Sequence, residues 1–372
     1  MVVESVRVLD LRNLAACEVE LGPGLNLLWG ANGAGKTNLL EATYMALAGR
    51  SCRTRDDRET IAFGKGLARS EAVVTDPRQR HRFLCSISRS DGRRHLVDGS
   101  PAGPQSATLR PALAVFMPDR LALVKGPPAG RRSHLDGFCA ALWPGRAETR
   151  RRYSRALAQR NALLGRIRAG AAGSSQLDAW DLELATAGIA LAADRAEAAE
   201  RLGPAFGAAA GALGLSEEVT LRYRPRSEAA SAEELAAELV ERRPTDLARG
   251  YTGWGPHHDE LLLESAGRSL RRYGSQGQQR TALLALLFAE RRALLDDGRP
   301  APLMLLDDVT SELDPEHRRL LVGHLVDDGG QALVTATEAA QLPRLEGAER
   351  REIAVRGGRP LTAALAESED AA

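Results

Sequence analysis

The sequence predicts an α/β fold that is interrupted by a long helical insertion. Three observations support this prediction. A strand runs into a glycine-rich loop and a helix near the N-terminus, apolar stripes at helical spacing fill the middle, and buried strands alternate with helices near the C-terminus. A chain of 372 residues is long enough for two domains, or for one large domain with an insertion.

The N-terminal region is expected to be rich in strands. Strands are expected at residues 2–9, 15–21 and 25–29, and a helix at residues 38–47. Further strands, separated by polar turns, are expected at residues 71–75, 83–87 and 95–97.

The middle of the chain is expected to be helical. Apolar stripes at helical spacing in residues 146–168 and 177–191 predict two long helices, and the small residues of 169–175 predict the turn of a helical hairpin. A third helix is expected at residues 232–242. Strands then return at 261–264, 303–306 and 331–334, with helices near 277–295 and 315–326.

Composition and charge exclude several classes of protein. Hydrophobic residues make up 44% and charged residues 27% of the chain, which is typical of a globular domain and not of a disordered one. Lys plus Arg number 50 against 49 Asp plus Glu, so any basic surface must be local. Two Arg-rich segments, 78–94 and 131–168, either contact phosphates or form solvated faces.

No membrane or disulfide-dependent class is indicated. The N-terminus acquires charge at once, and no stretch approaches the roughly 20 apolar residues that cross a bilayer. The four cysteines include no C-x-x-C pair, which argues against a structural zinc site. We therefore expect a cytoplasmic protein with no membrane partner.

The strongest motif is a phosphate loop, G-x-x-x-x-G-K-T. It consists of Gly30, Ala31, Asn32, Gly33, Ala34, Gly35, Lys36 and Thr37. Its glycines allow backbone N–H groups to surround a phosphate, and the helix that follows directs its positive end at the same point. Lys36 is expected to reach the β- and γ-phosphates in catalysis, and Thr37 to bind the metal. The predicted cofactors are ATP and Mg²⁺, because the strand before the loop and the helix after it disfavour a chance glycine-rich turn.

A buried strand near the C-terminus ends in two carboxylates, Asp307 and Asp308. Asp307 is the predicted second Mg²⁺ ligand, and Asp308 the predicted catalytic base or water-orienting group. Paired aspartates at a strand end also cap turns, but a phosphate loop in the same chain favours the catalytic interpretation.

A third motif, Gly274-Ser275-Gln276-Gly277-Gln278-Gln279, precedes an Ala/Leu-rich helix. It resembles the signature motif of ABC-type ATPases, which implies that Ser275, Gly277 and Gln278 contact a nucleotide γ-phosphate. Taken alone, the segment is also typical of a helix N-cap. Residues 311–314, which follow the paired aspartates, resemble the ABC D-loop.

Within this class the chain resembles the RecF family, whose members are related to SMC-type heads. The segments that carry the resemblance are 37–42, 118–119, 124–128, 131–136, 255–259, 306–308, 311–314 and 318–319. The resemblance implies an α/β, ABC/SMC-type ATPase head with an inserted helical arm domain. The implied parts are residues 1–115 for the N-terminal part of the head, 116–254 for the arm, and 255–372 for the signature motif and the C-terminal part of the head.

The resemblance also implies a function. It implies an ATP-dependent recombination mediator with weak DNA-dependent ATPase activity that binds single-stranded, gapped, duplex and junction DNA. Such a protein acts with RecO and RecR to load RecA in DNA repair, replication restart and SOS induction. ABC-type resemblance places the phosphate loop and the signature on opposite sides of a monomer, which implies an ATP-dependent homodimer in which Ser275 caps the other protomer's γ-phosphate.

Three other classes of protein are less favoured. A transporter ATPase subunit carries a His after the last core strand, where this chain has Thr335 and Thr337, either of which is a candidate for a weaker version of that contact. An SMC-like structural head needs far longer coiled-coil arms, and a nucleotide kinase would lack residues 274–279.

Two positions concern the ABC pattern itself. Asp119 is the candidate for the ABC Q-loop position. Asp308 is shorter than the Glu that many ABC proteins carry there, which fits slow hydrolysis.

Two smaller features leave alternatives open. His257 and His258 suggest a metal site, but no Cys or further His stands near them. Arg12 and Asn13 either approach the nucleotide or form a plain surface turn.

Overall fold

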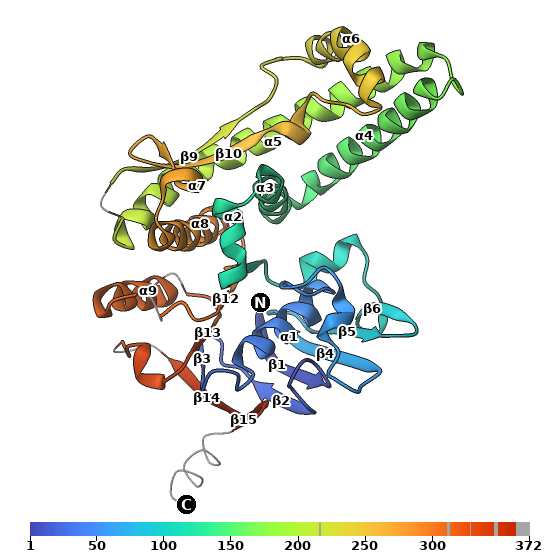
Figure 1. The fold of residues 1–372 in the computed structure, drawn as a ribbon. Helices are drawn as coiled ribbons and strands as arrows, with labels where there is room; N and C mark the ends of the chain where they lie inside the picture. The colour runs from blue at the N-terminus through green and yellow to red at the C-terminus, as the bar shows by residue number, and fades with distance from the viewer. Residues whose placement is uncertain (216, 311–312, 328, 346–348, 362–372) are drawn as a thin grey trace, which may run out of the picture. The chain divides into compact units, whose positions relative to one another are not determined.

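The computed structural model describes residues 1–215, 217–310, 313–327, 329–345 and 349–361. The chain forms two compact units, one of Met1–Arg120 with Leu294–Ala372 and one of Leu121–Ala293 (Figure 1). The first unit is an α/β head and the second is a helical arm. Residues 255–293 belong to the arm unit, beyond the end at residue 254 that the sequence predicts, because β10 (Glu260–Ser265) pairs with β9 (Val219–Arg224).

The head contains two six-stranded sheets. The first, in the order β2-β1-β4-β5-β6-β7, is antiparallel. Its strands are β1 (Val2–Leu9), β2 (Cys17–Glu20), β4 (Leu67–Thr75), β5 (Arg80–Ser88), β6 (Gly92–Val97) and β7 (Ser100–Pro101). Strands β4 and β5 alternate buried and more exposed residues over most of their length, as expected of a sheet with one face on the core.

The second sheet, in the order β15-β14-β3-β13-β12-β8, is mostly parallel. Its strands are β3 (Leu25–Trp29), β8 (Leu113–Phe116), β12 (Leu303–Leu306), β13 (Ala332–Ala336), β14 (Arg350–Arg356) and β15 (Arg359–Leu361). All residues of β12 and β13 are buried, as expected of central parallel strands, and Thr335 is the one polar residue among them. Helix α1 (Lys36–Ala48) contacts β4 of the first sheet and β13 of the second, so one core joins both sheets. A further head helix is α9 (Pro315–Asp327).

The arm confirms the predicted helical hairpin. Helix α4 (Ala147–Arg168) is followed by a turn and by α5 (Leu177–Ala212), which packs against α4 and against α6 (Ala232–Arg249) (Figure 1). The other helices of this part of the chain are α2 (Ala122–Lys125), α3 (Pro128–Leu142), α7 (Leu270–Tyr273) and α8 (Gln276–Asp296), and β11 (Arg268–Ser269) completes a three-stranded sheet. Among the described residues, no helix is long and apolar enough to cross a membrane.

A buried ion network joins the three long arm helices. The fully buried Arg160 donates to Asp181 at 2.5 Å, to Asp246 at 2.7 Å and to the hydroxyl of Thr252 at 2.7 Å. Breaking such a network by removing its cation leaves buried carboxylates without a partner, which is strongly destabilising. Arg160 therefore has a structural role within the arm.

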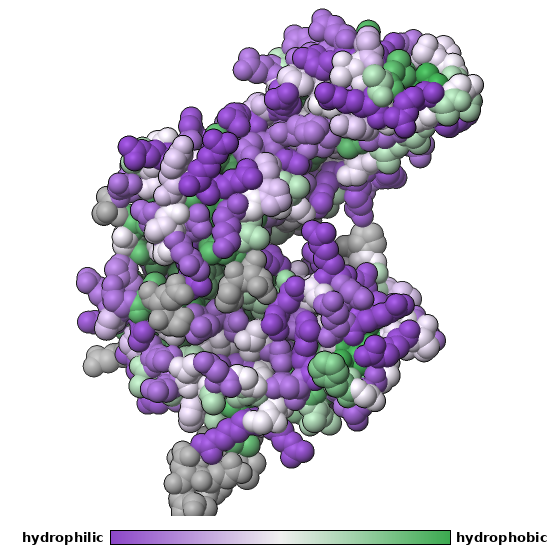
Figure 2. Space-filling view, in the orientation of Figure 1, coloured by the Kyte–Doolittle hydropathy of each residue, from purple (hydrophilic) through white to green (hydrophobic). Residues whose placement is uncertain are grey.

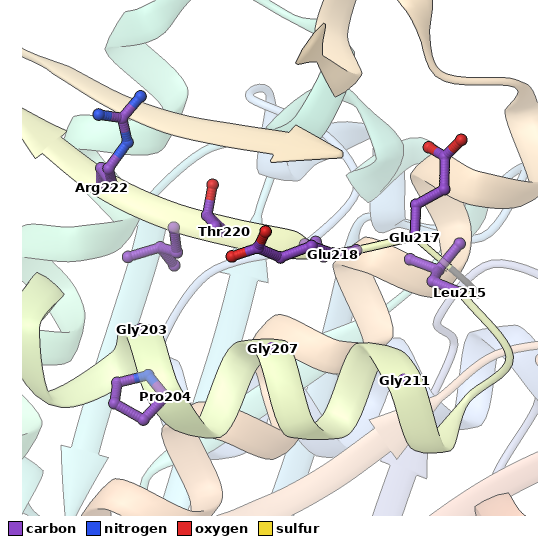
Figure 3. Close-up of a pocket in the computed structure, with 11 residues that line it drawn as sticks. Gly203, Pro204, Gly207, Gly211, Leu215, Glu217, Glu218, Thr220 and Arg222 are labelled. Carbon is purple, nitrogen blue, oxygen red and sulfur yellow. The ribbon is translucent and has the colours of Figure 1, made fainter. Parts of the chain in front are cut away.

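A hollow of about 600 Å³ lies between the C-terminal half of α5 and β9 (Figure 3). Gly203 and Gly207 bring the helix close to the strand: a Cβ added at Gly207 would lie 3.2 Å from the Val219 carbonyl oxygen. Glu217 at its edge already accepts a hydrogen bond from Ser265 at 3.0 Å. Close contacts between the glycines of α5 and the backbone of β9 thus border the hollow.

Candidate nucleotide site

The phosphate loop connects β3 to α1, as the sequence predicts. Gly30, Gly33 and Gly35 have φ angles of +150°, +79° and +112°, which residues with a Cβ rarely adopt. A Cβ at Gly30 would also lie 2.2 Å from the carbonyl oxygen of Val355. Within the described chain, the N–H groups of Gly33 and Gly35 donate no hydrogen bond to another residue. They fit an anion cradle at a helix N-terminus.

Two neighbouring turns support this loop, and the sequence does not predict the one that carries Gly358. The Asn13 side chain donates from Nδ2 to the Gly33 carbonyl at 2.8 Å. From the other side, the N–H of Gly358 in the β14–β15 turn donates to the Ala34 carbonyl at 2.8 Å. A Cβ at Gly358 would lie 2.2 Å from the Asn13 carbonyl oxygen, so the two turns meet beside the loop.

The side chain of Lys36 folds back over the loop. Its ammonium group donates to the carbonyls of Gly30 at 2.7 Å and Ala31 at 3.0 Å. Burial lowers the pKa of Lys36, and the negative charges of Asp307 and Asp308 oppose that shift. The Lys36 ammonium group thus lies over the loop, where a bound phosphate would compete with these two carbonyls for its N–H groups.

Thr37 and Asp307 meet at the end of β12, although 270 positions separate them in sequence. The Thr37 hydroxyl donates to Asp307 Oδ1 at 2.8 Å. Burial raises the pKa of Asp307, and the hydrogen bonds from Thr37 and Thr335 act against that rise. A hydroxyl and a carboxylate oxygen side by side are hard ligands of the kind that Mg²⁺ prefers. The residues present therefore fit a Mg²⁺ ion.

Thr335 forms hydrogen bonds with both aspartates. Its buried hydroxyl donates to Asp307 Oδ1 at 2.8 Å and accepts the Asp308 N–H at 2.8 Å. Asp308 is exposed and has a φ angle of +50°, a backbone conformation that non-glycine residues seldom adopt. Thr335 therefore positions the carboxylates, which differs from the γ-phosphate contact that we considered from the sequence. Thr337 instead accepts a hydrogen bond from Gln341 at 2.6 Å.

The buried carboxylate of Glu41, on helix α1, accepts hydrogen bonds from three side chains. Arg12 donates to both Glu41 oxygens at 3.0 Å, Ser51 donates at 2.5 Å and Arg53 at 3.2 Å. Burial alone would raise the pKa of Glu41, but the hydrogen bonds from Arg12 and Ser51 and the two guanidinium charges lower it. Asn13 thus contacts the phosphate loop itself, whereas Arg12 contacts α1, the helix that follows the loop.

The signature segment belongs to the arm unit and is described by itself. Ser275 accepts a hydrogen bond from the Gln278 N–H at 3.2 Å, and Gln278 Oε1 accepts the Ser275 N–H at 2.9 Å. This reciprocal pair is a capping box at the start of α8. Ser275 and Gly277 are exposed, so the N-cap geometry leaves them accessible to a ligand or to another protomer.

Three other candidates have different outcomes. His257 contacts the Tyr153 hydroxyl at 2.6 Å through Nδ1 and the Thr252 carbonyl at 3.0 Å through Nε2, and burial lowers its pKa to about 4. Both ring nitrogens are thus occupied, and the described residues contain no group of three metal-ligating side chains. The D-loop residues Ser311 and Glu312, and the side chain of Asp119, lie outside the described part of the chain.

Fold and site together define the class as an ATPase head of the ABC/SMC type with an inserted helical arm. Residues 5–110 match the family model of an AAA domain. The structure is similar to an Smc head bound to the C-winged helix domain of ScpA, with a TM-score of 0.60, 14% identity, and coverage of 99% of this chain and 100% of that one. At this identity the similarity concerns the fold alone.

More similar proteins place the chain in one family. It is 35% identical to the DNA replication and repair protein RecF of Heliobacterium modesticaldum, over 91% of this chain and 92% of that protein. It is 38% identical to RecF of Anaeromyxobacter sp. strain Fw109-5, over 95% and 97%. The solved structure of the recombination mediator protein RecF with ATP, in the RecFOR pathway, matches with a TM-score of 0.83 and 25% identity over 97% and 98%. The chain belongs to the RecF family.

Proposed function

We propose that this chain is an ATP-dependent recombination mediator of DNA repair. In the proposed function it binds ATP and Mg²⁺, dimerises around the nucleotide and binds gapped DNA. With RecO and RecR it then promotes the loading of RecA. The observation that carries the nucleotide part is the Thr37–Asp307 contact of 2.8 Å beside Lys36, because it joins the two halves of a phosphate and metal site.

The roles of the head residues follow from this geometry. Thr37 and Asp307 would hold the Mg²⁺, which when bound neutralises phosphate charge. Lys36 would exchange its two carbonyl partners for the β- and γ-phosphate oxygens, and Asp308 would orient the attacking water from its exposed position. Because an Asp reaches less far than a Glu, hydrolysis is expected to be slow, which suits a switch.

The signature residues act in the other protomer in this proposal. Ser275 and Gly277 are exposed and Gln278 is half-buried at the positive end of α8, where N–H groups and a hydroxyl suit a γ-phosphate. The family resemblance assigns them to the nucleotide bound by a second copy. The dimer therefore forms only when ATP is present.

Fewer arginines are available to contact DNA than the sequence predicts. Many arginines of residues 78–94 and 131–168 pair with carboxylates, for example Arg82 with Glu71 at 2.6 Å and Arg152 with Glu183 at 2.9 Å. Exposed arginines of these segments for which no ion pair with a carboxylate of the described residues is seen are Arg78, Arg89, Arg94, Arg166 and Arg168. Hydrophilic side chains dominate the face seen in Figure 2.

Titration of DNA at several salt concentrations tests this surface. Arg166→Ala should weaken binding and lower the slope of log K against log salt by roughly 0.7–0.9, because one phosphate contact is lost. The matched control is Arg152→Ala, which removes the same charge from the same helix but from an existing ion pair. Equal effects of the two variants would exclude Arg166 as a phosphate contact.

RecA loading on gapped DNA tests the function as a whole. In the presence of RecO, RecR and MgATP, the chain should accelerate RecA filament formation, and the Lys36→Met variant should not. A chain that binds no DNA with ATP, or that accelerates loading equally without a functional phosphate loop, would contradict the proposed function.

A further inference from the structure

The turn after η1 (Asp57–Thr60) exposes an aromatic side chain completely. The exposure of Phe63 is 103% of its reference value, which is the highest among the large apolar residues of the described chain. Single exposed apolar residues are common on protein surfaces. The surroundings of Phe63 distinguish it from such cases.

The backbone that carries Phe63 is held firmly. Phe63 and Gly64 are the central residues of a turn that the Lys65 N–H closes by donating to the Ala62 carbonyl at 3.0 Å. Gly64 has a φ angle of +75°, as the third residue of a type II turn requires. The Ala62 N–H donates to the Asp10 carbonyl at 2.9 Å, and the Gly66 carbonyl accepts the Arg89 N–H at 3.0 Å. A ring on such a turn loses little backbone freedom when it makes a contact.

Two exposed cationic side chains flank the turn that carries Phe63. Lys65 lies two residues away, with its ammonium group 3.6 Å from Asp10 Oδ1, and its side chain is 55% exposed. Arg89 lies on the adjoining strand connection and donates from Nε to the Lys65 carbonyl at 3.1 Å. Lysine is depleted from the apolar centres of protein–protein interfaces. An aromatic side chain between cations is instead the combination that binds single-stranded nucleic acid, by base stacking and phosphate contact.

We propose that Phe63 stacks on an unpaired base of gapped DNA, with Lys65 and Arg89 on the flanking phosphates. This inference rests on the proposed DNA binding and deepens it by naming an element that distinguishes unpaired bases from duplex. In an intact duplex both faces of each interior base are already stacked, so Phe63 gains no contact there.

Fluorescence anisotropy titrations of the full chain with MgATP test the inference. The DNA probes are a labelled gapped duplex and the same sequence without the gap, each at several salt concentrations. Phe63→Ala should weaken binding of the gapped DNA by about 5- to 150-fold and leave duplex binding and the salt slope unchanged. Phe63→Trp preserves stacking and should bind like the wild type. Lys65→Ala should instead lower the slope by roughly 0.7.

The outcomes separate this inference from the function on which it rests. Because the Phe63 ring is fully exposed, the alanine variant should unfold at the wild-type temperature, so a lost affinity reports the contact itself. Unchanged binding of both probes by Phe63→Ala, or an equal loss on both, would overturn the inference. If the wild-type chain binds neither probe, the proposed DNA binding itself fails.

Discussion

Replacing Thr335 by Val tests how the two aspartates are positioned. The substitution keeps the volume of a fully buried side chain but removes the hydroxyl that joins Asp307 and Asp308. A hydrogen bond to a charged carboxylate contributes about 1.5–3 kcal/mol, and one from a backbone N–H about 0.5–1.5 kcal/mol. Thr335→Val should therefore lower the free energy of unfolding by about 2–4 kcal/mol.

The same substitution should change the pH dependence of Mg²⁺-ATP binding. The Thr335 hydrogen bond counteracts the burial that raises the pKa of Asp307, so its loss raises that pKa further. Since only the ionised carboxylate binds the metal, Mg²⁺-dependent affinity should be lost at a higher pH than in the wild type as the pH falls. Binding titrations at a series of pH values measure this shift.

Thr335→Ser is the matched control, because it keeps the hydroxyl and loses one buried methyl group. It should cost only about 1 kcal/mol, with no change in the pH profile. Urea denaturation of both variants compares the stabilities. If Thr335→Val is as stable as Thr335→Ser and binds Mg²⁺-ATP with the same pH dependence, Thr335 does not position the carboxylates.

Further substitutions test three other features: the turn beside the phosphate loop, the catalytic residues and the buried network of the arm. Gly358→Ala should abolish ATP binding because its Cβ would lie 2.2 Å from a carbonyl oxygen beside the phosphate loop, whereas Gly357→Ala, also at positive φ but in open space, should bind ATP in calorimetry. Lys36→Met should prevent ATP-dependent dimers, and Asp308→Asn should make them persist; sedimentation that finds both variants in one state would refute these roles. Arg160→Met should destabilise the arm by about 3–5 kcal/mol in denaturation, and a near-neutral effect would contradict the buried network.

The local parts of the fold and site were predictable from the sequence. The phosphate loop is contiguous, so its strand, glycines and helix all appear within residues 25–48. The partnership of Thr37 with Asp307 was also predicted, because each belongs to a motif whose chemistry requires the other. The apolar stripes of α4 and α5 gave the helical hairpin, since helical periodicity is a local signal.

The long-range supports of the site were not predictable in the same way. Gly358 is over three hundred residues from the loop that it braces, and a Gly-Gly pair near the C-terminus indicates only a hairpin turn. Nothing local shows that Glu41 accepts hydrogen bonds from Arg12, or that Thr335 bonds the aspartates instead of a phosphate. These contacts depend on strand order, which periodicity does not reveal.

Local charge was an incomplete guide to the surface for the same reason. The count of arginines in residues 131–168 ignored acids that reach them from elsewhere in the chain. Glu183 on α5 pairs with Arg152, and Asp181 and Asp246 bury Arg160 completely. A positive segment in sequence therefore became a mostly neutral surface in three dimensions.

Mixing two inactive variants tests the central claim, a nucleotide site shared between protomers. Ser275→Arg destroys the signature and Lys36→Met destroys the phosphate loop, so neither variant alone should form ATP-dependent dimers. In a heterodimer of the two, one composite site is doubly damaged but the other combines an intact phosphate loop with an intact signature. Sedimentation velocity of the equimolar mixture with MgATP should therefore show dimers that neither variant forms alone. A mixture that stays monomeric, or a Ser275→Arg variant that dimerises normally alone, would contradict the account.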